Sequence, residues 1–174
     1  FHKIDGEFSE TFFVGYDEYE CDAKLLGIVN DEAIKHDYSD GGFWYLIFDK
    51  TPFYAESGGQ VADTGVIENL ENEVVAKVHD VLKPFGRVFY HKVEILKPVK
   101  VGDVLRLKID VYRRKKISAN HTATHLINAA LKKVFGPNTL QAGSLVNDEK
   151  LRFDYTINKA PSREELEMVE KIAN

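Results

Sequence analysis

The hydrophobic pattern of the chain changes its period once, near Ser118, and this change constrains the fold more than any other feature. Before it, short runs rich in β-branched and aromatic residues are separated by turn residues, which is typical of strands. The runs cover residues 23–29, 43–48, 64–70, 74–81, 87–93 and 104–111. Six short, closely spaced strands predict a small antiparallel β-barrel. In the last run apolar and charged residues alternate, so we expect one buried face and one wet face.

After Ser118 the apolar residues follow helical spacing as far as Phe135. Ser118 or Asn120 can cap this helix, and Gly136-Pro137 ends it. Residues 140–146 and 151–157 then form a predicted strand pair joined at Asn147-Asp148. A capping box at Ser162–Glu165 opens a last helix. The pattern predicts an α+β chain with two domains, residues 1–112 and residues 113–174.

Length and composition narrow the function classes. With 174 residues, 44% of them hydrophobic, the chain can form one large domain or two small ones. A single cysteine excludes a disulfide framework and a four-cysteine zinc site, and it favours the reducing cytoplasm. No apolar run is long enough to span a membrane, and no leader opens the chain. Because the first residue is Phe1 and not Met, we expect the chain to be cut from something longer.

The formal net charge of -5 argues weakly against nucleic-acid binding, but the distribution of charge along the chain does not argue against it. Residues 1–82 hold 5 basic and 18 acidic side chains, residues 83–116 hold 11 basic and 3 acidic ones, and residues 117–174 hold 7 of each. The basic stretch ends in Arg113, Arg114, Lys115 and Lys116. A local basic surface is sufficient to bind phosphates. The alternative is a solvated strand pair that ends in a basic turn.

A histidine pair is the first candidate site. His121 and His125 are four residues apart on the predicted helix, so both imidazoles can point at one metal ion. The metalloprotease version of this motif needs a glutamate after the first histidine, and Thr122 occupies that place. Zinc requires at least three protein ligands, so this is half a metal site. The alternative is two ordinary histidines, one packed and one exposed.

Two further motifs are polar and glycine-rich. In Ser57-Gly58-Gly59-Gln60 the glycines let the backbone approach a ligand closely, and Gln60 offers a donor and an acceptor. The alternative is a simple turn between strands.

In residues 141–144, Gln141 and Ser144 could line a pocket with Thr124. Alternatively, Gln141 caps a turn and Ser144 faces solvent. Cys21 lies far from these motifs in the sequence, and we interpret it as a buried or edge thiol.

Taken together, these motifs resemble the alanyl-tRNA synthetase family. The resemblance rests on residues 51–60 (TPFYAESGGQ) with Asp63-Thr64-Gly65, on the HTATH motif, on residues 141–144 and 151–155, and on residues 13–16 (FVGY). It runs along nearly the whole chain, and the ten-residue match is highly specific. The chain is therefore identified as an internal fragment of that family, with a barrel like domain II of translation factors followed by most of an editing domain.

The resemblance implies a function. Members of the family hydrolyse serine or glycine wrongly esterified to the alanine tRNA. His121 and His125 correspond to the first two zinc ligands, while the remaining Cys and His ligands are absent from this chain. Thr124 and Gln141 correspond to positions that tune editing, and Gly58, Gly59 and Gln60 to a loop of the editing pocket.

The same resemblance names partners and cofactors. We expect the basic run at residues 113–116 to hold the tRNA backbone, and the rest of the synthetase to act in cis. ATP and Mg²⁺ serve an upstream domain, outside this chain. Two alternatives stay open: a tRNA-binding or structural module without activity of its own, and a free-standing editing hydrolase. Free-standing editing proteins typically lack the Tyr-Ala-Glu-Ser lead-in found here.

Overall fold

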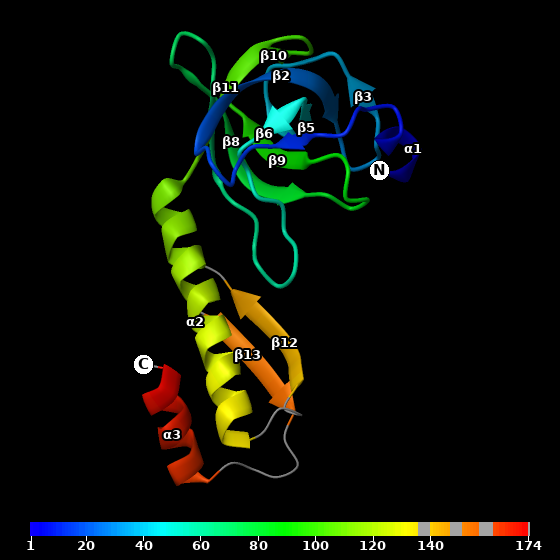
Figure 1. The fold of residues 1–174 in the computed structure, drawn as a ribbon. Helices are drawn as coiled ribbons and strands as arrows, with labels where there is room; N and C mark the ends of the chain where they lie inside the picture. The colour runs from blue at the N-terminus through cyan, green and yellow to red at the C-terminus, as the bar shows by residue number, and fades with distance from the viewer. Residues whose placement is uncertain (136–139, 147–150, 157–161, 174) are drawn as a thin grey trace. The chain divides into compact units, whose positions relative to one another are not determined.

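The computed structural model describes residues 1–135, 140–146, 151–156 and 162–173, with segments 140–146 and 151–156 described by their backbone. These residues form an α+β structure (Figure 1) that divides into two compact units. The first unit holds residues 1–57 and 62–111, and the second holds residues 58–61 and 112–174. The predicted domains of residues 1–112 and 113–174 stay predictions, and the observed units differ from them in placing residues 58–61 in the second unit.

A closed barrel of six antiparallel strands makes up most of the first unit. The order around the barrel is β2 (Glu20–Val29), β5 (Gly42–Phe48), β9 (Tyr90–Ile95), β8 (Val74–Leu82), β7 (Gly65–Glu68) and β11 (Val104–Ile109). The barrel closes because β11 pairs with β7 on one side and with β2 on the other. All six strands predicted from the hydrophobic pattern are present, and the predicted barrel is confirmed.

Short elements outside the barrel connect distant sequence motifs. β1 (Phe12–Phe13) pairs in parallel with β6 (Lys50–Thr51), so residues 13–16 lie beside the start of residues 51–60. β3 (Lys35–His36) extends the sheet next to β2, and β4 (Tyr38–Ser39) pairs with β10 (Val99–Lys100). The helix α1 (His2–Asp5) begins the chain.

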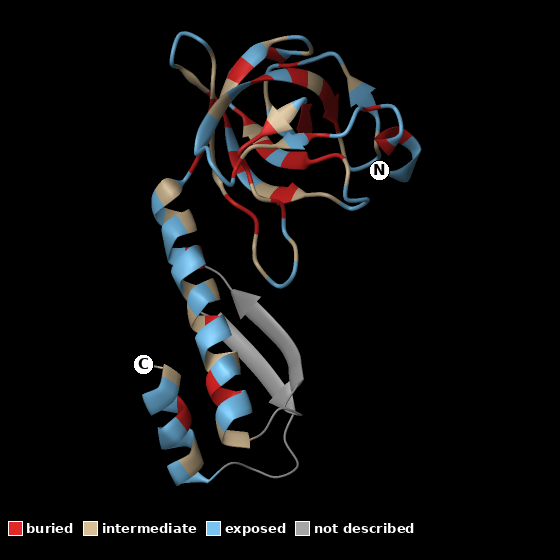
Figure 2. Cartoon of the chain, in the orientation of Figure 1, coloured by how far each residue is buried: buried red, intermediate tan, exposed pale blue. Residues whose placement is uncertain are grey.

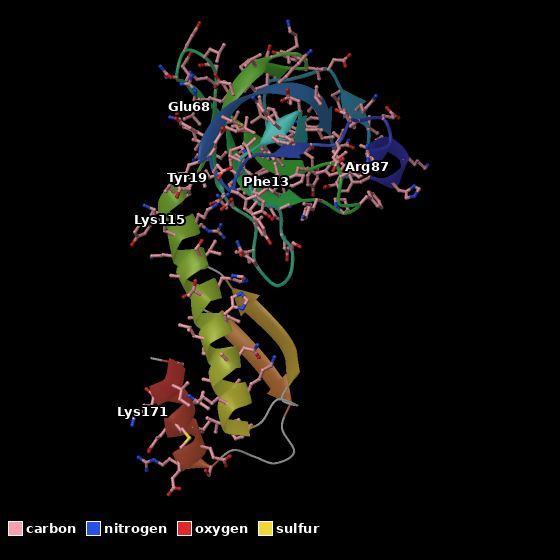
Figure 3. The ribbon with its side chains drawn as sticks, viewed as in Figure 1. Phe13, Tyr19, Glu68, Arg87, Lys115 and Lys171 are labelled. Carbon is pink, nitrogen blue, oxygen red and sulfur yellow. The ribbon has the colours of Figure 1, made fainter. Side chains whose placement is uncertain are left out.

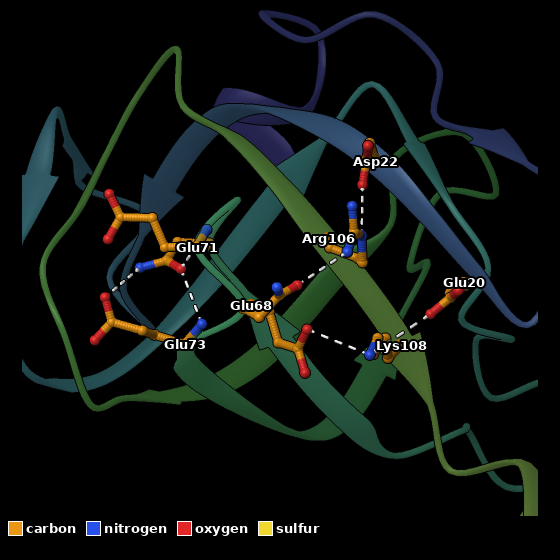
Figure 4. A network of polar contacts seen from close by, with 9 residues as sticks. Glu20, Asp22, Glu68, Glu71, Glu73, Arg106 and Lys108 are labelled. Carbon is orange, nitrogen blue, oxygen red and sulfur yellow. Dashed lines mark hydrogen bonds and ion pairs between the residues drawn. The ribbon is translucent and has the colours of Figure 1, made fainter.

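Charged side chains line the outer face where the barrel closes (Figure 4). On β11, Arg106 pairs with Asp22 of β2 at 3.1 Å, and Lys108 lies 3.3 Å from Glu68 of β7 and 3.8 Å from Glu20. Opposite charges at facing positions stabilise neighbouring strands by about 0.2–1 kcal/mol per pair. Two basic residues of the stretch 83–116 are therefore neutralised by the acidic first part of the chain.

The barrel encloses the main hydrophobic core, where buried residues gather (Figure 2). Its largest fully buried side chains include Leu25, Ile28, Leu46, Phe48, Phe53, Ile67 and Leu107. β5 is buried on both faces, because Tyr45 and Ile47 belong to a second cluster that contains Ile4 and Phe8 of the N-terminal segment. Asp5 fixes this segment, since its carboxylate accepts hydrogen bonds from Tyr90 Oη at 2.9 Å and from Arg87 at 3.1 Å.

The second unit is built on the long helix α2 (Val111–Phe135). The predicted helix start near Ser118 is wrong, because the helix already begins at Val111 and contains the whole basic run. Asp110 directly precedes it, and aspartate is a favoured residue at that position. The predicted caps Ser118 and Asn120 lie inside α2, where their carbonyls accept hydrogen bonds from Thr122 and Thr124.

The remaining elements follow α2. β12 (Leu140–Val146) and β13 (Leu151–Thr156) form the predicted antiparallel pair, and the packing of α2 on this pair stays a prediction. α3 (Arg163–Ala173) begins with the predicted capping box, in which Ser162 Oγ accepts from the Glu165 amide at 3.1 Å. The predicted turn at Asn147-Asp148 and the predicted stop at Gly136-Pro137 lie outside the described residues. No helix in the described part of the chain is long and apolar enough to cross a membrane.

Candidate functional site

The histidine pair lies on one face of α2, as the spacing predicts. The ring centroids of His121 and His125 are 4.6 Å apart, with the rings nearly perpendicular at 85°. His121 is half-buried and His125 is exposed. Two imidazoles this close can bind one cation from the same side of the helix, and neutral imidazole is a common zinc ligand. The donor chemistry therefore fits zinc.

The pair supplies two ligands. Among the described residues no group of three or more His, Cys, Asp or Glu side chains could hold a metal ion. The lone Cys21 lies in β2, where it is half-buried and packs against the barrel core. Burial raises the pKa of the Cys21 thiol to about 11, so the thiolate that a metal needs is scarce near neutral pH. Cys21 has the character of the buried or edge thiol that the sequence indicated.

Thr124 lies between the histidines in sequence and is buried, with 6% of its surface exposed. Its hydroxyl donates to the carbonyl of Asn120 at 3.0 Å, one turn earlier in the helix. A threonine hydroxyl has one hydrogen and two lone pairs. Because the hydrogen is used within the helix, Thr124 Oγ1 can accept a hydrogen bond from a ligand but does not donate one at the same time.

The Gly-Gly-Gln motif forms a tight turn between Ser57 and Gln60. Gly58 and Gly59 both have positive φ, at 58° and 81°. Two central residues with positive φ are characteristic of a type I′ turn, and glycine adopts this backbone without strain. The turn interpretation of the motif accounts for both glycines. Gln60 is half-buried, and the turn belongs to the same compact unit as α2.

Reciprocal hydrogen bonds close the base of the loop that carries this turn. The amide of Tyr54 donates to Asp63 Oδ2 at 2.8 Å, and the amide of Asp63 donates to the Tyr54 carbonyl at 3.1 Å. Asp63 is buried, with 3% exposed. The amide of Glu56 also donates to the Val81 carbonyl of β8 at 3.0 Å. The sequence match at Asp63 thus corresponds to a residue that holds the loop closed.

A buried histidine, which the sequence analysis missed, anchors the same motif to the barrel. His91 Nε2 lies 2.8 Å from Thr51 Oγ1, and His91 Nδ1 lies 2.9 Å from the Leu46 carbonyl. A carbonyl only accepts, so Nδ1 carries the proton and Nε2 accepts from Thr51. Burial lowers the pKa of His91 to about 4. The one signal in the sequence is that His91 shares a face of β9 with Val93 and Ile95, and this signal is weak.

The basic run lies in the first two turns of α2. Arg113 and Arg114 are half-buried, whereas Lys115 and Lys116 are exposed. Lys115 projects from the surface of the helix (Figure 3), and Lys116 Nζ lies 4.7 Å from the centre of the Tyr112 ring. The first turn contains no acidic residue. Cations near a helix start can bind anions, so the exposed Lys115 and Lys116 are compatible with phosphate binding, which stays a prediction.

Gln141 is placed by its backbone alone. It lies in β12 opposite Tyr155, and the strand register shifts between Gln141 and Gly143. Such bulges often occur next to functional sites, where they change the direction of a side chain. The side chains of Gln141 and Ser144, and any pocket they form with Thr124, lie outside the described residues.

Comparisons with known proteins match most of the chain to tRNA synthetases. A family model described as tRNA synthetases class II (A) matches residues 2–113. An alanine–tRNA ligase of Enterococcus faecalis is 47% identical over 165 residues, which are 95% of this chain and 19% of the relative. One of Lactobacillus gasseri is 49% identical over 156 residues, which are 89% of this chain and 18% of the relative. One of Pelotomaculum thermopropionicum is 42% identical over 175 aligned positions, which cover 100% of this chain and 20% of the relative. The chain thus spans about a fifth of the length of these relatives.

Proposed function

The chain belongs to the family of class II tRNA synthetases (A), and from this membership we propose that it performs the editing step of an alanyl-tRNA synthetase. In that step, alanine tRNA that carries serine or glycine is hydrolysed. The resemblance to alanyl-tRNA synthetases is confirmed by relatives named alanine–tRNA ligase. The observation that carries the proposal is the pair His121 and His125 on one face of α2.

A second site is needed because an amino-acid-activating site cannot reject these competitors well. A pocket for alanine also admits the smaller glycine, and it discriminates weakly against a side chain that only adds a hydroxyl. A site that binds the hydroxyl itself discriminates strongly, because alanine would leave its polar groups unpaired.

Thr124 has the chemistry for that recognition. Its buried oxygen has free acceptor capacity while its hydrogen is held by Asn120. The serine hydroxyl can donate to it, and the alanine methyl group cannot. In this proposal Thr124 is a specificity residue and not a nucleophile, and Gln141 supports it from β12.

His121 and His125 would hold zinc together with ligands outside this chain. When bound, zinc would activate water or bind the amino group of the substrate. The histidines orient the site from the rigid helix, and the turn at Gly58–Gly59 presents Gln60 within the same unit. The alanine tRNA is the proposed partner, and the basic run of α2 would bind its phosphates.

The test uses the full-length protein that contains this chain. We expect His121→Ala to abolish hydrolysis of alanine tRNA charged with serine, while His79→Ala, at an exposed histidine of the barrel, retains it. Thr124→Val removes the hydroxyl at nearly constant volume. It should reduce the preference for seryl over alanyl ester by about tenfold or more and leave hydrolysis of the glycyl ester unchanged. Unchanged seryl hydrolysis in His121→Ala would refute the proposal.

A second candidate function is a tRNA-binding module without activity of its own. It is favoured by the finding that the described residues supply two metal ligands and no larger group. Metal analysis of the full-length protein that contains this chain distinguishes the two functions. Tightly held zinc at one ion per chain, lost in His125→Ala, would exclude the second candidate.

A further inference from the structure

The barrel unit also contains a pocket that takes no part in the proposed editing site, although Phe13 and Tyr16 of its lining belong to residues 13–16. A pocket of about 500 Å³ opens between residues 10–16 and the connection from β8 to β9. The side chains that matter in its lining are Glu10, Phe12, Phe13, Tyr16, Lys83 and Phe89. Phe13, labelled in Figure 3, comes from β1. All of these residues belong to the first compact unit.

The pocket has a fixed aromatic floor. Phe13 stacks on Phe89 with ring centroids 5.8 Å apart and an angle of 21° between the planes. Tyr16 meets Phe13 edge-on at 4.9 Å. The backbone beneath them is held by β1–β6 pairing, in which the amides of Phe12 and Val14 donate to β6 and its flank at 2.9 Å. The floor is therefore preorganised.

Two rings of the pocket remain largely in water. Phe12 is 69% exposed and Tyr16 is 85% exposed. Such rings on a rigid frame lose little conformational entropy when a flat ligand stacks on them. Aromatic side chains stack on unpaired bases in proteins that bind single-stranded nucleic acid.

Opposite charges flank the aromatic rings. Lys83 Nζ lies 5.7 Å from the centre of the Phe89 ring, and Glu10 lines the same pocket. A ligand that suits all three features has a flat ring, a negative group and a hydrogen-bond donor on its edge. A nucleotide whose base carries an amino group has this combination, since carboxylates accept from the cytosine amino group and lysine binds phosphate.

We propose that this pocket binds one unpaired nucleotide of RNA whose base carries an amino group. The choice of RNA rests on the proposed function. The base stacks on Phe12 and Tyr16, its amino group donates to Glu10, and its phosphate accepts from Lys83.

The experiment measures the binding of short fluorescent oligocytidylate and oligouridylate to the 174-residue chain by anisotropy. Every protein carries Lys115→Gln and Lys116→Gln, which reduces binding at α2. Oligocytidylate should bind more tightly than oligouridylate, and Phe12→Ala with Tyr16→Ala should weaken it about tenfold. Lys83→Gln should weaken it and reduce its salt dependence. The matched controls are Phe43→Ala, at another exposed ring, and Lys77→Gln, at an exposed lysine of β8.

Several results would overturn the proposal. They are an absence of oligocytidylate binding, equal affinity for both oligonucleotides, or equal losses in the aromatic variants and in Phe43→Ala. Tyr16-dependent binding of a proline-rich peptide in place of RNA would assign the pocket to a protein partner. Ester hydrolysis is a separate readout. If His121→Ala abolishes hydrolysis while oligocytidylate binding is absent, this inference fails and the proposed function stands.

Discussion

His91 and Thr51 connect a sequence motif to the barrel through one buried hydrogen bond. The imidazole is fully buried and neutral, with Phe48 and Phe53 packed edge-on against it at 5.3 and 5.6 Å. Thr51 Oγ1 in turn accepts from the Phe53 amide at 3.1 Å. The start of residues 51–60 is thus fixed from two sides, which gives the loop beyond it a rigid base.

This arrangement predicts a pH dependence of stability. The pKa of His91 is lowered to about 4 by burial, whereas an unfolded histidine titrates near 6.5. Between these values the unfolded chain binds more protons, so the free energy of unfolding rises with pH. The contribution is complete above pH 6.5 and is lost as the pH falls towards 4. It amounts to about 3 kcal/mol at most. Urea unfolding from pH 4 to pH 8 measures it.

The variant His91→Asn isolates the contribution of this residue. Its amide can still donate to the Leu46 carbonyl, but it cannot be protonated in this range. Its unfolding free energy should therefore fall less between pH 6.5 and pH 4 than that of the unsubstituted protein. If the unfolding free energy of the unsubstituted protein and of His91→Asn changed in parallel with pH, the pH dependence could not be assigned to His91.

At the scale of elements, closure of the barrel depends on Gly65. A Cβ atom there would lie 2.0 Å from the Lys108 carbonyl oxygen and 2.9 Å from Ile109 Cα, both on β11. Backbone atoms cannot move aside without opening the β7–β11 ladder. We expect Gly65→Ala to destabilise the protein by about 2 kcal/mol or more in urea unfolding. Gly41→Ala is the control, because a Cβ there meets nothing within 4 Å, and an equal loss in both variants would disprove the packing argument.

The first turns of α2 predict a salt-dependent interaction with tRNA. Lys115→Gln with Lys116→Gln removes two exposed charges, and glutamine has nearly the helix propensity of lysine. The slope of log affinity against log salt should decrease by about one for each lysine–phosphate interaction that is removed. Lys132→Gln with Lys133→Gln, in the last turn of the same helix, should leave the slope unchanged. Equal slopes in all three proteins would show that the basic run is a solvated surface.

The elements were predictable from the sequence to different degrees. Strict alternation of apolar and charged residues from Leu105 to Ile109 predicted β11, and turn residues marked the ends of the other barrel strands. The start of α2 was predicted too far along the chain, because serine and asparagine are common N-cap residues and Ser118 and Asn120 fit that role. Asp110, which directly precedes the helix, is also a favoured N-cap residue and was overlooked. The positions of Gly65 and His91 depend on backbone atoms far away in sequence, which no local pattern reveals. The pair His121 and His125 was predictable because both lie within one helical repeat.

At the scale of the whole molecule, acidic residues of the first part of the chain neutralise part of the basic stretch. Four of its basic residues, Arg87, Lys97, Arg106 and Lys108, form ion pairs with acidic residues that precede position 83. The exposed pairs among them, such as Lys97–Glu73 and Arg106–Asp22, contribute about 0–1 kcal/mol each. Their consequence is therefore mainly electrostatic: they neutralise four of the seven basic residues in the barrel part of the stretch, whereas Lys115 and Lys116 stay exposed on α2.

The two compact units have separate hydrophobic cores, which predicts separate unfolding. The barrel core contains Ile67, and the cluster formed by α2 and α3 contains Leu131 and Val169. Truncating a buried Ile or Leu to Ala costs about 2–5 kcal/mol. Ile67→Ala should therefore speed amide hydrogen exchange in the barrel strands about thirtyfold or more and leave α2 unchanged, whereas Leu131→Ala should do the reverse. If either variant accelerates exchange equally in both units, the chain unfolds as one cooperative body, and the site on α2 depends on the barrel for its stability.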